Sequence, residues 1–501
     1  MNILDPILNK ITMYKLVAFG LGIISALGII FAATGRISMD PSTMTLSLLL
    51  LATSSFVTEF IFSKIWRRPL NTESWAITTF IIFLIFPAPK SGLEVVITLL
   101  VGGLASSSKY LIAWKGRHIF NPAAFAVALV GILNLQITTW WVGSAALWPI
   151  TLIFGLLVVR KIRKFSLFFA FVGTALMLQL MTFLIDGTLN PTIIQSILIA
   201  SPLIFLSTIM LTEPATMPPR RLQQVIFGVI IAVLYVEAWK IGPLTIYPEV
   251  ALLLGNIYAF IVSPKFKVEL RLKEIQKISD RVMNYVFIPT ERFGFMAGQY
   301  MEWTLDHVAL DFRGNRRSFT IASSPTEDTV QLGVKFYNPS STFKYTMSTM
   351  KPGDSIYASQ LAGNFVLKGN ERRKLVFIAG GIGVTPFRSM VKYVTDMQLA
   401  TDIVVIYAVG DPSEFAYLEE FKQAERYGVK LARIVTTPKT TEDGYVHSQV
   451  NAELISQLVP DYNERFFYIS GPNAMVDATR SQLSSIGVPR TRIKKDHFSG
   501  Y

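Results

Sequence analysis

The sequence predicts a polytopic α-helical membrane domain of about ten spans, fused to a module that pairs a small antiparallel β-barrel with a doubly wound α/β domain. Three observations lead to this prediction: apolar residues concentrate in the first half, an apolar strand ends in a glycine turn, and strand–helix units repeat after that turn. The 501 residues are 51% hydrophobic, with a mean hydropathy of +0.43. A soluble protein rarely carries so apolar a composition.

Composition also bounds the domains and the partners. We expect residues 1–263 to form the membrane domain, 264–277 a linker with the first strand, 268–370 the β-barrel and 371–501 the α/β domain. The net charge of +13 does not predict a nucleic-acid partner, because the basic residues of the first half lie between apolar runs, where membrane topology explains them. The chain has no cysteine, which excludes disulfides, thiolate zinc sites and Cys-ligated iron–sulfur clusters.

The apolar runs of the first half predict ten spans in contact with the lipid bilayer. Several runs are shorter than the roughly 20 residues of a perpendicular span, so tilt, interruption or partial re-entry is expected. Lysines and arginines gather at one set of alternate ends, and the other set carries only Arg36, Lys90 and Lys240. The positive-inside rule then places the N-terminus and the C-terminal half in the cytoplasm, with the chain in a plasma (bacterial inner) membrane. The expected spans lie near residues 13–34, 42–64, 74–87, 91–112, 120–137, 144–160, 165–186, 191–212, 222–240 and 245–263.

Two polar elements interrupt this half on the same predicted side. Asn121-Pro122 opens the fifth span, and Thr212-Glu213-Pro214 closes the eighth. Proline-broken backbone at membrane depth is tolerated where it lines a cavity or is covered by protein. An Asn-Pro pair is also a common helix start, so a structural role and a binding site both stay open.

These two elements, with their spacing, resemble the ten-span membrane subunits D of the Rnf complex and B of the sodium-translocating NADH:quinone reductase. The resemblance implies a membrane flavin or quinone near Asn121, Pro122, Thr212, Glu213 and Pro214. Those subunits carry FMN esterified to a threonine in a loop after the Asn-Pro helix. The corresponding loop here, residues 140–147, reads Trp-Trp-Val-Gly-Ser-Ala-Ala-Leu and holds no threonine. A covalent FMN is therefore not expected, and a noncovalent FMN or a quinone stays open.

In the second half, residues 374–390 form a strand, a glycine turn and a helix start. The apolar run Leu375–Ala379 predicts a buried strand. Gly380, Gly381 and Gly383 allow close backbone approach, and we expect Thr385 as the N-cap with Pro386 at the first helical position. The N-terminus of a helix attracts anions, so the pattern predicts a dinucleotide pyrophosphate site, with an ordinary βα turn as the alternative.

Short strands precede this turn and predict the barrel. One of them holds Arg317-Ser318-Phe319-Thr320, which combines a guanidinium for phosphate, an aromatic ring for stacking and a hydroxyl for a ring nitrogen. Alternation places Arg317 and Phe319 on one face. Ser341 and Thr342 follow at an expected helix start and form a second phosphate cradle. The expected strands are Tyr285–Ile288, Gln299–Leu305, Ser318–Ala322, Val330–Tyr337 and Ser355–Ser359.

The remaining strand–helix units predict a parallel sheet that binds its ligand at the carboxyl ends of the strands. Strands are expected at Asp402–Val409, Leu431–Val435 and Phe466–Ser470. The last of these leads into a second glycine turn, Gly471-Pro472, with Met475 in the helix that follows.

Together, these motifs resemble the ferredoxin–NADP reductase superfamily over about residues 268–501. The resemblance implies that Arg317, flanked by Ser318, holds the FAD pyrophosphate, that Phe319 packs on the isoalloxazine, and that Thr320 faces N5. Ser341 and Thr342 would make the second phosphate contact, and Tyr501 would cover the flavin. Phe319 replaces the usual Tyr, and Ser470 stands where many members carry Cys. The nicotinamide-nucleotide motifs of the superfamily match Gly380, Gly381, Gly383, Thr385, Pro386, Gly471, Pro472 and Met475.

The resemblance implies a flavin-dependent NAD(P)H oxidoreductase that passes electrons from cytoplasmic NADH or NADPH through FAD to a membrane flavin or quinone, with ion coupling left open. Neither heme nor another metal is expected, because axial ligation of heme needs several intramembrane histidines and only His118 of the four lies in the first half. Asp411 and Glu414, after the second strand, favour NADH. Two alternatives stay open: a membrane scaffold or transporter with a nucleotide-sensing domain, and a reductase that delivers electrons to a partner protein.

Overall fold

The computed structural model describes residue 8 and residues 11–66, 72–114, 117–236, 239–241, 244–263, 267–305, 315–338, 340–367, 373–437 and 445–496. The chain divides into two compact units. The first, called the helical unit here, comprises Ile11–Lys265, and the second, called the C-terminal unit, comprises Phe266–Tyr501 with Met1–Lys10.

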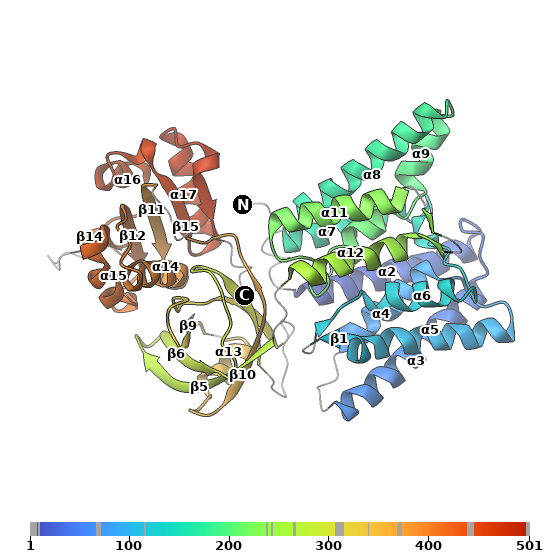
Figure 1. Cartoon of the computed structure of the whole chain (residues 1–501), viewed down its shortest axis with the longest axis horizontal. Coiled ribbons are helices and arrows are strands. Elements are labelled where there is room, and N and C mark those ends of the chain that lie inside the picture. Colours follow the sequence, from blue (N-terminus) through green and yellow to red (C-terminus); the bar gives the residue numbers. More distant parts are fainter. Residues whose placement is uncertain are drawn as a thin grey trace. The chain divides into compact units, whose positions relative to one another are not determined.

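The helical unit has a helix at each of the ten positions where the apolar runs predict a span (Figure 1). The eighth is interrupted, since α9 ends at Ile199 and the chain resumes as a short helix followed by a π-helix, η2. Interruption of a span is expected from its Pro202. The helices are α2 (Met13–Ala33), α3 (Pro41–Ile65), α4 (Thr72–Ile85), α5 (Gly92–Leu111), α6 (Pro122–Ile132), α7 (Trp148–Ile162), α8 (Phe165–Ile185), α9 (Pro191–Ile199), α10 (Leu203–Phe205), η2 (Leu206–Met210), α11 (Arg221–Val236) and α12 (Pro248–Val262).

Within the described residues, five helices are long and apolar enough to cross a membrane: α2, α3, α5, α8 and the interrupted Pro191–Met210. Four more helices are apolar but shorter, among them Pro122–Ile132. The expected span at 120–137 is thus too long, because helix α6 ends at Ile132 and a turn follows, with Asn134 at a φ of 53°. Two-stranded ribbons also occur, β1 (Ala113–Trp114) with β2 (Arg117–His118) and β3 (Lys240–Ile241) with β4 (Leu244–Thr245).

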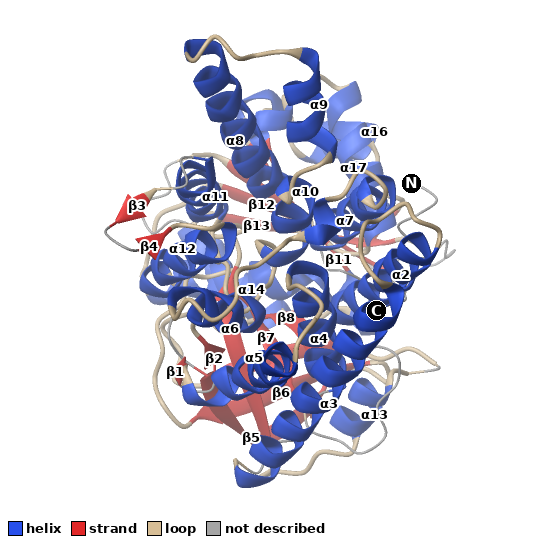
Figure 2. Cartoon of the chain, turned by 90° about the vertical axis from the view of Figure 1, so that its right-hand side faces the viewer, coloured by secondary structure: helices blue, strands red, loops and turns tan. Residues whose placement is uncertain are grey.

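Helix packing in this unit follows one pattern twice. In the first five helices, α2 packs on α4, α3 on α5, and α5 on α6. In the second five, α7 packs on α10 and η2, α8 on α11, and α11 on α12. The two sets meet where α6 packs against α12 and where α2 packs against α7. Figure 2 shows α12 between α11 and α6. Recurrence of the same pairings in chain order indicates an internal structural repeat.

The first part of the C-terminal unit is an antiparallel sheet with strand order β8-β7-β10-β5-β6-β9. No ladder pairing joins β8 to β9 among the described strands, although the Ala322 N–H, just after β8, donates to the Gln331 carbonyl of β9 at 2.9 Å. The sheet is therefore a half-barrel, which bears out the predicted antiparallel barrel in part. Its interior is filled by large buried side chains, including Trp303, Phe287 and Phe343 from helix α13 (Thr342–Ser348). The strands are β5 (Lys267–Lys277), β6 (Val282–Pro289), β7 (Tyr300–Thr304), β8 (Arg316–Thr320), β9 (Val330–Lys335) and β10 (Ser355–Ala362).

The second part is a parallel sheet with order β14-β13-β12-β11-β15-β16. Alternate residues of its central strand face opposite ways: Phe377 packs towards α14 and α15, whereas Ile378 packs towards α16 and α17. Helices therefore cover both faces, which confirms the doubly wound prediction (Figure 1). The elements are β11 (Leu375–Gly380), α14 (Thr385–Asp396), β12 (Ile403–Val409), α15 (Leu418–Ala424), β13 (Val429–Val435), β14 (Val446–His447), α16 (Ala452–Leu458), β15 (Phe466–Ser470), α17 (Asn473–Ser485) and β16 (Ile493–Lys495).

Candidate functional site

The two glycine turns of the C-terminal unit lie against each other. Strands β11 and β15 are parallel neighbours with Ala379 opposite Ser470, so the turns leave the same edge of the sheet side by side. A Cβ added at Gly383 would lie 2.6 Å from the Gly471 Cα and 2.6 Å from the Ser470 carbonyl oxygen. Backbone cannot yield at such distances, so this contact requires glycine. The structure thus brings together both predicted nucleotide motifs.

The start of helix α14 differs in one detail from the expectation. A 3-10 turn, η3 (Gly381–Val384), leads directly into the helix, and the N-cap position falls on Val384. The predicted N-cap at Thr385 is therefore wrong: Thr385 is already helical, and its hydroxyl donates to the Ile382 carbonyl at 3.1 Å. Pro386 is consequently the second helical residue and not, as predicted, the first, but it still lies in the first turn.

Ser470 lies beneath these turns and is fully buried. Its hydroxyl donates to the Asp496 carboxylate at 3.4 Å. Burial, together with the charges of Asp496 and Glu302, raises the pKa of Tyr300, which pairs with Thr320 across strands β7 and β8. The Asp496 carboxylate therefore accepts a hydrogen bond from Ser470 and also contributes to the raised pKa of Tyr300, the cross-strand neighbour of Thr320. Tyr501 lies outside the described residues.

The predicted flavin residues of strand β8 converge on helix α13. Arg317 is 3% exposed, and its Cζ lies 5.2 Å from the centroid of the Phe343 ring. The Phe319 ring lies 5.9 Å from the same ring, centroid to centroid. Arg317 and Phe319 share the inner face, as alternation predicts, while Ser318 is exposed on the other face and Thr320 is buried.

Ser341 caps helix α13 and accepts a hydrogen bond from the Lys344 backbone N–H at 3.2 Å. Ser341 itself is buried, and Thr342 is the first helical residue. Because Phe343 follows directly and contacts both Arg317 and Phe319, the two predicted phosphate elements form one neighbourhood.

Sequence reasoning missed a hollow of about 530 Å³ beside this helix. The Nζ atoms of Lys335 and Lys344 lie 5.9 and 5.1 Å from the centroid of the exposed Tyr337 ring. The signal in the sequence is a pair of tyrosines that flank the hydroxyl cluster. The lining residues are Asp280, Arg281, Phe336, Tyr337, Asn338, Ser340, Thr342 and Tyr345.

In the helical unit, the two polar elements meet although they are far apart in the chain. The Asn121 side chain caps helix α6 by accepting from the Ala124 N–H at 3.0 Å, and its Nδ2 donates to Glu213 Oε2 at 2.8 Å. His118 Nε2 lies 3.0 Å from Glu213 Oε1. The structure thus brings together Asn121 and Glu213 and adds His118.

Asn256 of helix α12 completes the cluster and was missed by sequence reasoning. It accepts from the Asn121 backbone N–H at 2.9 Å and donates to the Thr216 carbonyl at 3.3 Å. Its signal is a polar side chain inside an apolar run. Thr212 is not part of the cluster, because its hydroxyl donates to Thr208 one turn back at 2.6 Å. Pro122 and Pro214 flank the contacts and have no backbone N–H to donate.

Among the residues that the structure describes, no group of three His, Cys, Asp or Glu side chains is arranged to hold a metal ion.

Comparison with known proteins bears on the C-terminal unit. The oxidoreductase NAD-binding domain family matches residues 377–481. The chain is 27% identical over 207 residues to NADH oxidoreductase HCR of Escherichia coli, covering 41% of this chain and 60% of that protein. It is 26% identical over 248 residues to the reductase component of propane 2-monooxygenase of Mycolicibacterium smegmatis, covering 48% and 66%. The chain spans about half to two thirds of the length of these curated relatives.

Similar solved structures cover the same unit. The flavohem-like FAD/NAD binding domain of nitric oxide dioxygenase from Vibrio cholerae is 21% identical, with a TM-score of 0.41 over 46% of this chain and 98% of that one. A ferredoxin NADP+ reductase from Neisseria gonorrhoeae is 17% identical, with a TM-score of 0.40 over 46% and 98%. The family match and the relatives, with the two adjacent glycine turns, identify the C-terminal unit as an FAD-containing NAD(P)H oxidoreductase domain.

Proposed function

We propose that the chain is a membrane-bound NAD(P)H dehydrogenase. Two electrons enter the C-terminal unit from cytoplasmic NADH or NADPH, pass through FAD, and leave to a flavin or quinone held in the helical unit. The observation that carries the proposal is the contact of the two glycine turns in a unit where Arg317, Phe319 and helix α13 also converge.

The nucleotide is proposed to bind at the carboxyl ends of β11 and β15. A Cβ at Gly381 would meet nothing within 4 Å, so the turn is open to a pyrophosphate there, and the N-terminus of α14 adds its positive dipole. Asp411 follows the neighbouring strand β12 and accepts from the Ser413 backbone N–H at 2.9 Å. A carboxylate at this position repels a 2′-phosphate, which favours NADH.

The residues present also fit FAD. The buried guanidinium of Arg317 next to the capped start of α13 suits a pyrophosphate, and the hollow beside Thr342 has room for an adenosine. We assign Phe319 to pack on the ring, Thr320 to hydrogen-bond N5, Ser470 to orient the nicotinamide and Tyr501 to cover the flavin. When bound, FAD supplies the acceptor for the hydride and releases its electrons singly or in pairs.

In the helical unit, the proposal assigns ten membrane crossings, with both the N-terminus and the C-terminal unit in the cytoplasm. The Asn121–Glu213 cluster joins the first set of five helices to the second. With an odd number of crossings per set, the two sets would be inverted, and membrane proteins of that kind bind at the interface of their repeats. Polar groups in spans usually mark such sites, which supports a noncovalent FMN or quinone and the likeness to the membrane subunits of the Rnf complex and the sodium-translocating NADH:quinone reductase.

A second candidate keeps the reductase but moves the acceptor. One of the relatives is named as the reductase component of an oxygenase, so the electrons could leave to a partner protein. A scaffold or transporter with a nucleotide-sensing domain is the third candidate, and it predicts no reducible flavin.

An anaerobic titration separates these candidates. Detergent-purified protein is titrated with NADH and then NADPH while flavin absorbance is followed, and flavins are counted after denaturation. We expect NADH to bleach FAD. A second reducible flavin would place a redox carrier in the helical unit, whereas one flavin would leave quinone or a partner protein as the acceptor. A protein without reducible flavin would contradict the dehydrogenase.

The orientation of the chain in the membrane can be tested by cysteine labelling, because the sequence has no native cysteine that would also react. Single cysteines at Lys90 and Arg220, both exposed, mark opposite predicted sides. In inside-out vesicles, a membrane-impermeant maleimide should label Arg220→Cys and spare Lys90→Cys, and intact cells should give the reverse. Labelling of both from one side would overturn the proposed topology.

A further inference from the structure

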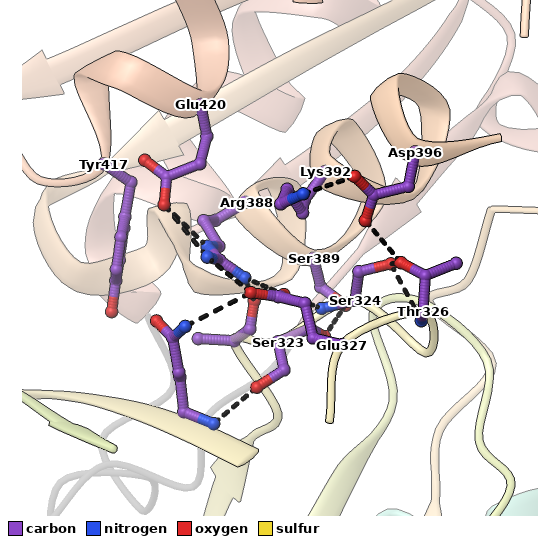
Figure 3. A network of polar contacts seen from close by, with 12 residues as sticks. Ser323, Ser324, Thr326, Glu327, Arg388, Ser389, Lys392, Asp396, Tyr417 and Glu420 are labelled. Carbon is purple, nitrogen blue, oxygen red and sulfur yellow. Dashed lines mark hydrogen bonds and ion pairs between the residues drawn. The ribbon is translucent and has the colours of Figure 1, made fainter. Parts of the chain in front are cut away.

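A buried arginine joins the half-barrel to the nucleotide domain. Arg388 lies in the first turns of α14 and is 3% exposed (Figure 3). On the half-barrel side, its guanidinium donates to both carboxylate oxygens of Glu327, from Nη2 at 3.0 Å and from Nη1, and to the Ala322 carbonyl at 3.2 Å. On its own side, it donates to Glu420 of α15 from Nε at 3.1 Å and Nη2 at 2.9 Å. All three nitrogens are therefore used.

The two-pronged contact of Arg388 with Glu327 is called the fork here. The surrounding charges keep the Arg388 guanidinium ionised. Burial disfavours the cation, but hydrogen bonding and charge from Glu327, and then the charge of Glu420, hold the pKa of Arg388 above its ordinary value. Bidentate arginine–carboxylate pairs fix orientation as well as distance, which a lysine ammonium does not. Glu327 is itself held in place, because its Oε2 accepts from the Ser324 backbone N–H at 2.6 Å.

The next residue of the helix makes a second attachment to the same segment. The Ser389 hydroxyl is fully buried and donates to the Ser323 carbonyl at 2.5 Å. It also accepts from the Gly298 N–H at 3.4 Å. Consecutive residues of α14 thus hold the segment 322–324, which continues directly from strand β8 (Figure 3).

This arrangement links the two cofactor elements over short stretches of rigid chain. Thr320, the proposed N5 contact, is the last residue of β8 and stands two residues before Ala322. Thr385, at the end of the nucleotide turn, stands three residues before Arg388 in the same helix. Any rotation of the nucleotide domain on the half-barrel would have to break the Arg388–Glu327 fork.

A third contact lies on the other flank. The Tyr417 hydroxyl donates to Asn284 of strand β6 at 2.9 Å, and its ring lies 5.7 Å from the Arg388 Cζ. A Cβ added at Gly333 of β9 would lie 2.6 Å from the Tyr417 hydroxyl and 2.8 Å from Thr385 Cγ2. The half-barrel therefore meets the nucleotide turn itself, next to the fork.

We propose that Arg388 is a positioning residue for hydride transfer, which acts through its fork to Glu327 by fixing the flavin strand relative to the nucleotide turn. This inference rests on the proposed dehydrogenase function. Glu420 offers a matched control: it contacts the same guanidinium with a carboxylate, but both partners belong to the nucleotide domain, so its loss leaves the fork to the half-barrel in place.

The test uses the full-length, FAD-loaded protein in anaerobic stopped-flow mixing with NADH. In Glu327→Gln, we expect the limiting rate constant of flavin reduction to fall at least about 10-fold, because ångström-scale misplacement of reacting groups has effects of this size. The dissociation constant for NADH should stay within about 2-fold, and the long-wavelength charge-transfer absorbance of the stacked nicotinamide and flavin should weaken. In Glu420→Gln, the rate constant should stay within about 2-fold of wild type.

Arg388→Lys provides the second variant, since it keeps the charge and loses the fork. Its rate constant should fall as in Glu327→Gln. If Glu327→Gln does not retain FAD, the rate constant of Arg388→Lys decides whether the fork positions the reactants. A wild-type rate constant in these variants, or an equal fall in Glu420→Gln, would overturn the positioning role. Wild-type flavin that NADH does not reduce would instead overturn the proposed function.

Discussion

The two units of the chain assemble their candidate sites by different means. In the C-terminal unit, the glycine turns meet through backbone atoms, with Gly383 against Gly471 and Ser470. In the helical unit, Asn121, His118 and Glu213 meet through side-chain hydrogen bonds between a helix start and a broken helix end. The first site is therefore sensitive to added volume, and the second to removed polarity.

The largest effect is expected where added volume has no space to enter. In Gly383→Ala, the new methyl group would displace the Gly471 turn, and NADH-dependent flavin reduction should fall by at least about 100-fold through misplaced backbone. Gly410→Ala is the control, because a Cβ at Gly410, after the adjacent strand β12, meets no atom within 4 Å. Stopped-flow reduction compares the two. Equal rates of flavin reduction in the two variants would contradict a role of the Gly383–Gly471 contact in nucleotide binding.

In the helical unit, a change of polarity at Glu213 should slow quinone reduction without changing the rate of FAD reduction. In Glu213→Gln, one acceptor oxygen becomes a donor facing Asn121 or His118, at the cost of a half-buried hydrogen bond, about 1 kcal/mol. We expect steady-state quinone reduction to fall roughly 10-fold with an unchanged rate of FAD reduction by NADH. Glu94→Gln, at the solvent-exposed start of α5, should change neither rate. A slower FAD reduction in Glu213→Gln would contradict the division of labour between the units.

A smaller effect is expected from the cap of helix α13. Ser341→Ala removes the acceptor for the Lys344 N–H, which typically costs about 1 kcal/mol. The affinity for FAD should fall about 5-fold, as the free energy of one cap implies. Flavin release on dilution measures this, and Ser348→Ala, at the exposed other end of α13 and away from the hollow, serves as the control. Unchanged FAD affinity in Ser341→Ala would separate α13 from the flavin site.

The smallest effect is expected at the amino ends of strands β11 and β15, opposite the glycine turns. A hydrogen bond from Arg465 at 2.6 Å, and then one from Lys374 at 3.0 Å, lower the pKa of Asp461 to about 2. A lowered pKa stabilises the fold above the ordinary value of 3.8, and this contribution is lost as the pH falls towards 2. Asp461→Asn should lower the free energy of unfolding by less than about 1 kcal/mol at pH 7, and this difference should shrink as the pH falls through about 2. Thermal melts of the wild type and Asp461→Asn between pH 7 and pH 2 measure whether the difference in their stability shrinks with falling pH.

Much of this architecture could be read from local patterns. Apolar runs predicted the positions of ten helices, and glycine with alternating strands predicted the parallel sheet, because these signals depend on neighbours in the chain. The N-cap at Thr385 was wrong, since a 3-10 turn moved the helix start by one residue. The sequence predicted an antiparallel barrel but could not show that the ladder stops between β8 and β9, because alternation does not specify strand partners.

Contacts between distant residues were beyond sequence reasoning. Asn121 and Glu213 are 92 residues apart, and no local rule pairs them, although the sequence placed both elements on the same predicted side. Arg388 was visible as a charge beside an apolar helical face, but its partners Glu327 and Glu420 lie 61 and 32 residues away. The roles assigned to Arg317, Thr320, Ser470 and Tyr501 stay predictions.

The order of the strands has a consequence for biosynthesis. Strand β11 lies at the centre of the parallel sheet, and Arg465, at the start of β15, bonds to Leu375 across 90 residues of chain. The first glycine turn therefore leaves the ribosome well before the second turn that completes it. Long-range parallel pairing is slow to form. A nascent chain stalled before β15 would carry the helical unit and a finished half-barrel, yet only one of the two glycine turns, so the pair of turns is among the last features that this protein assembles.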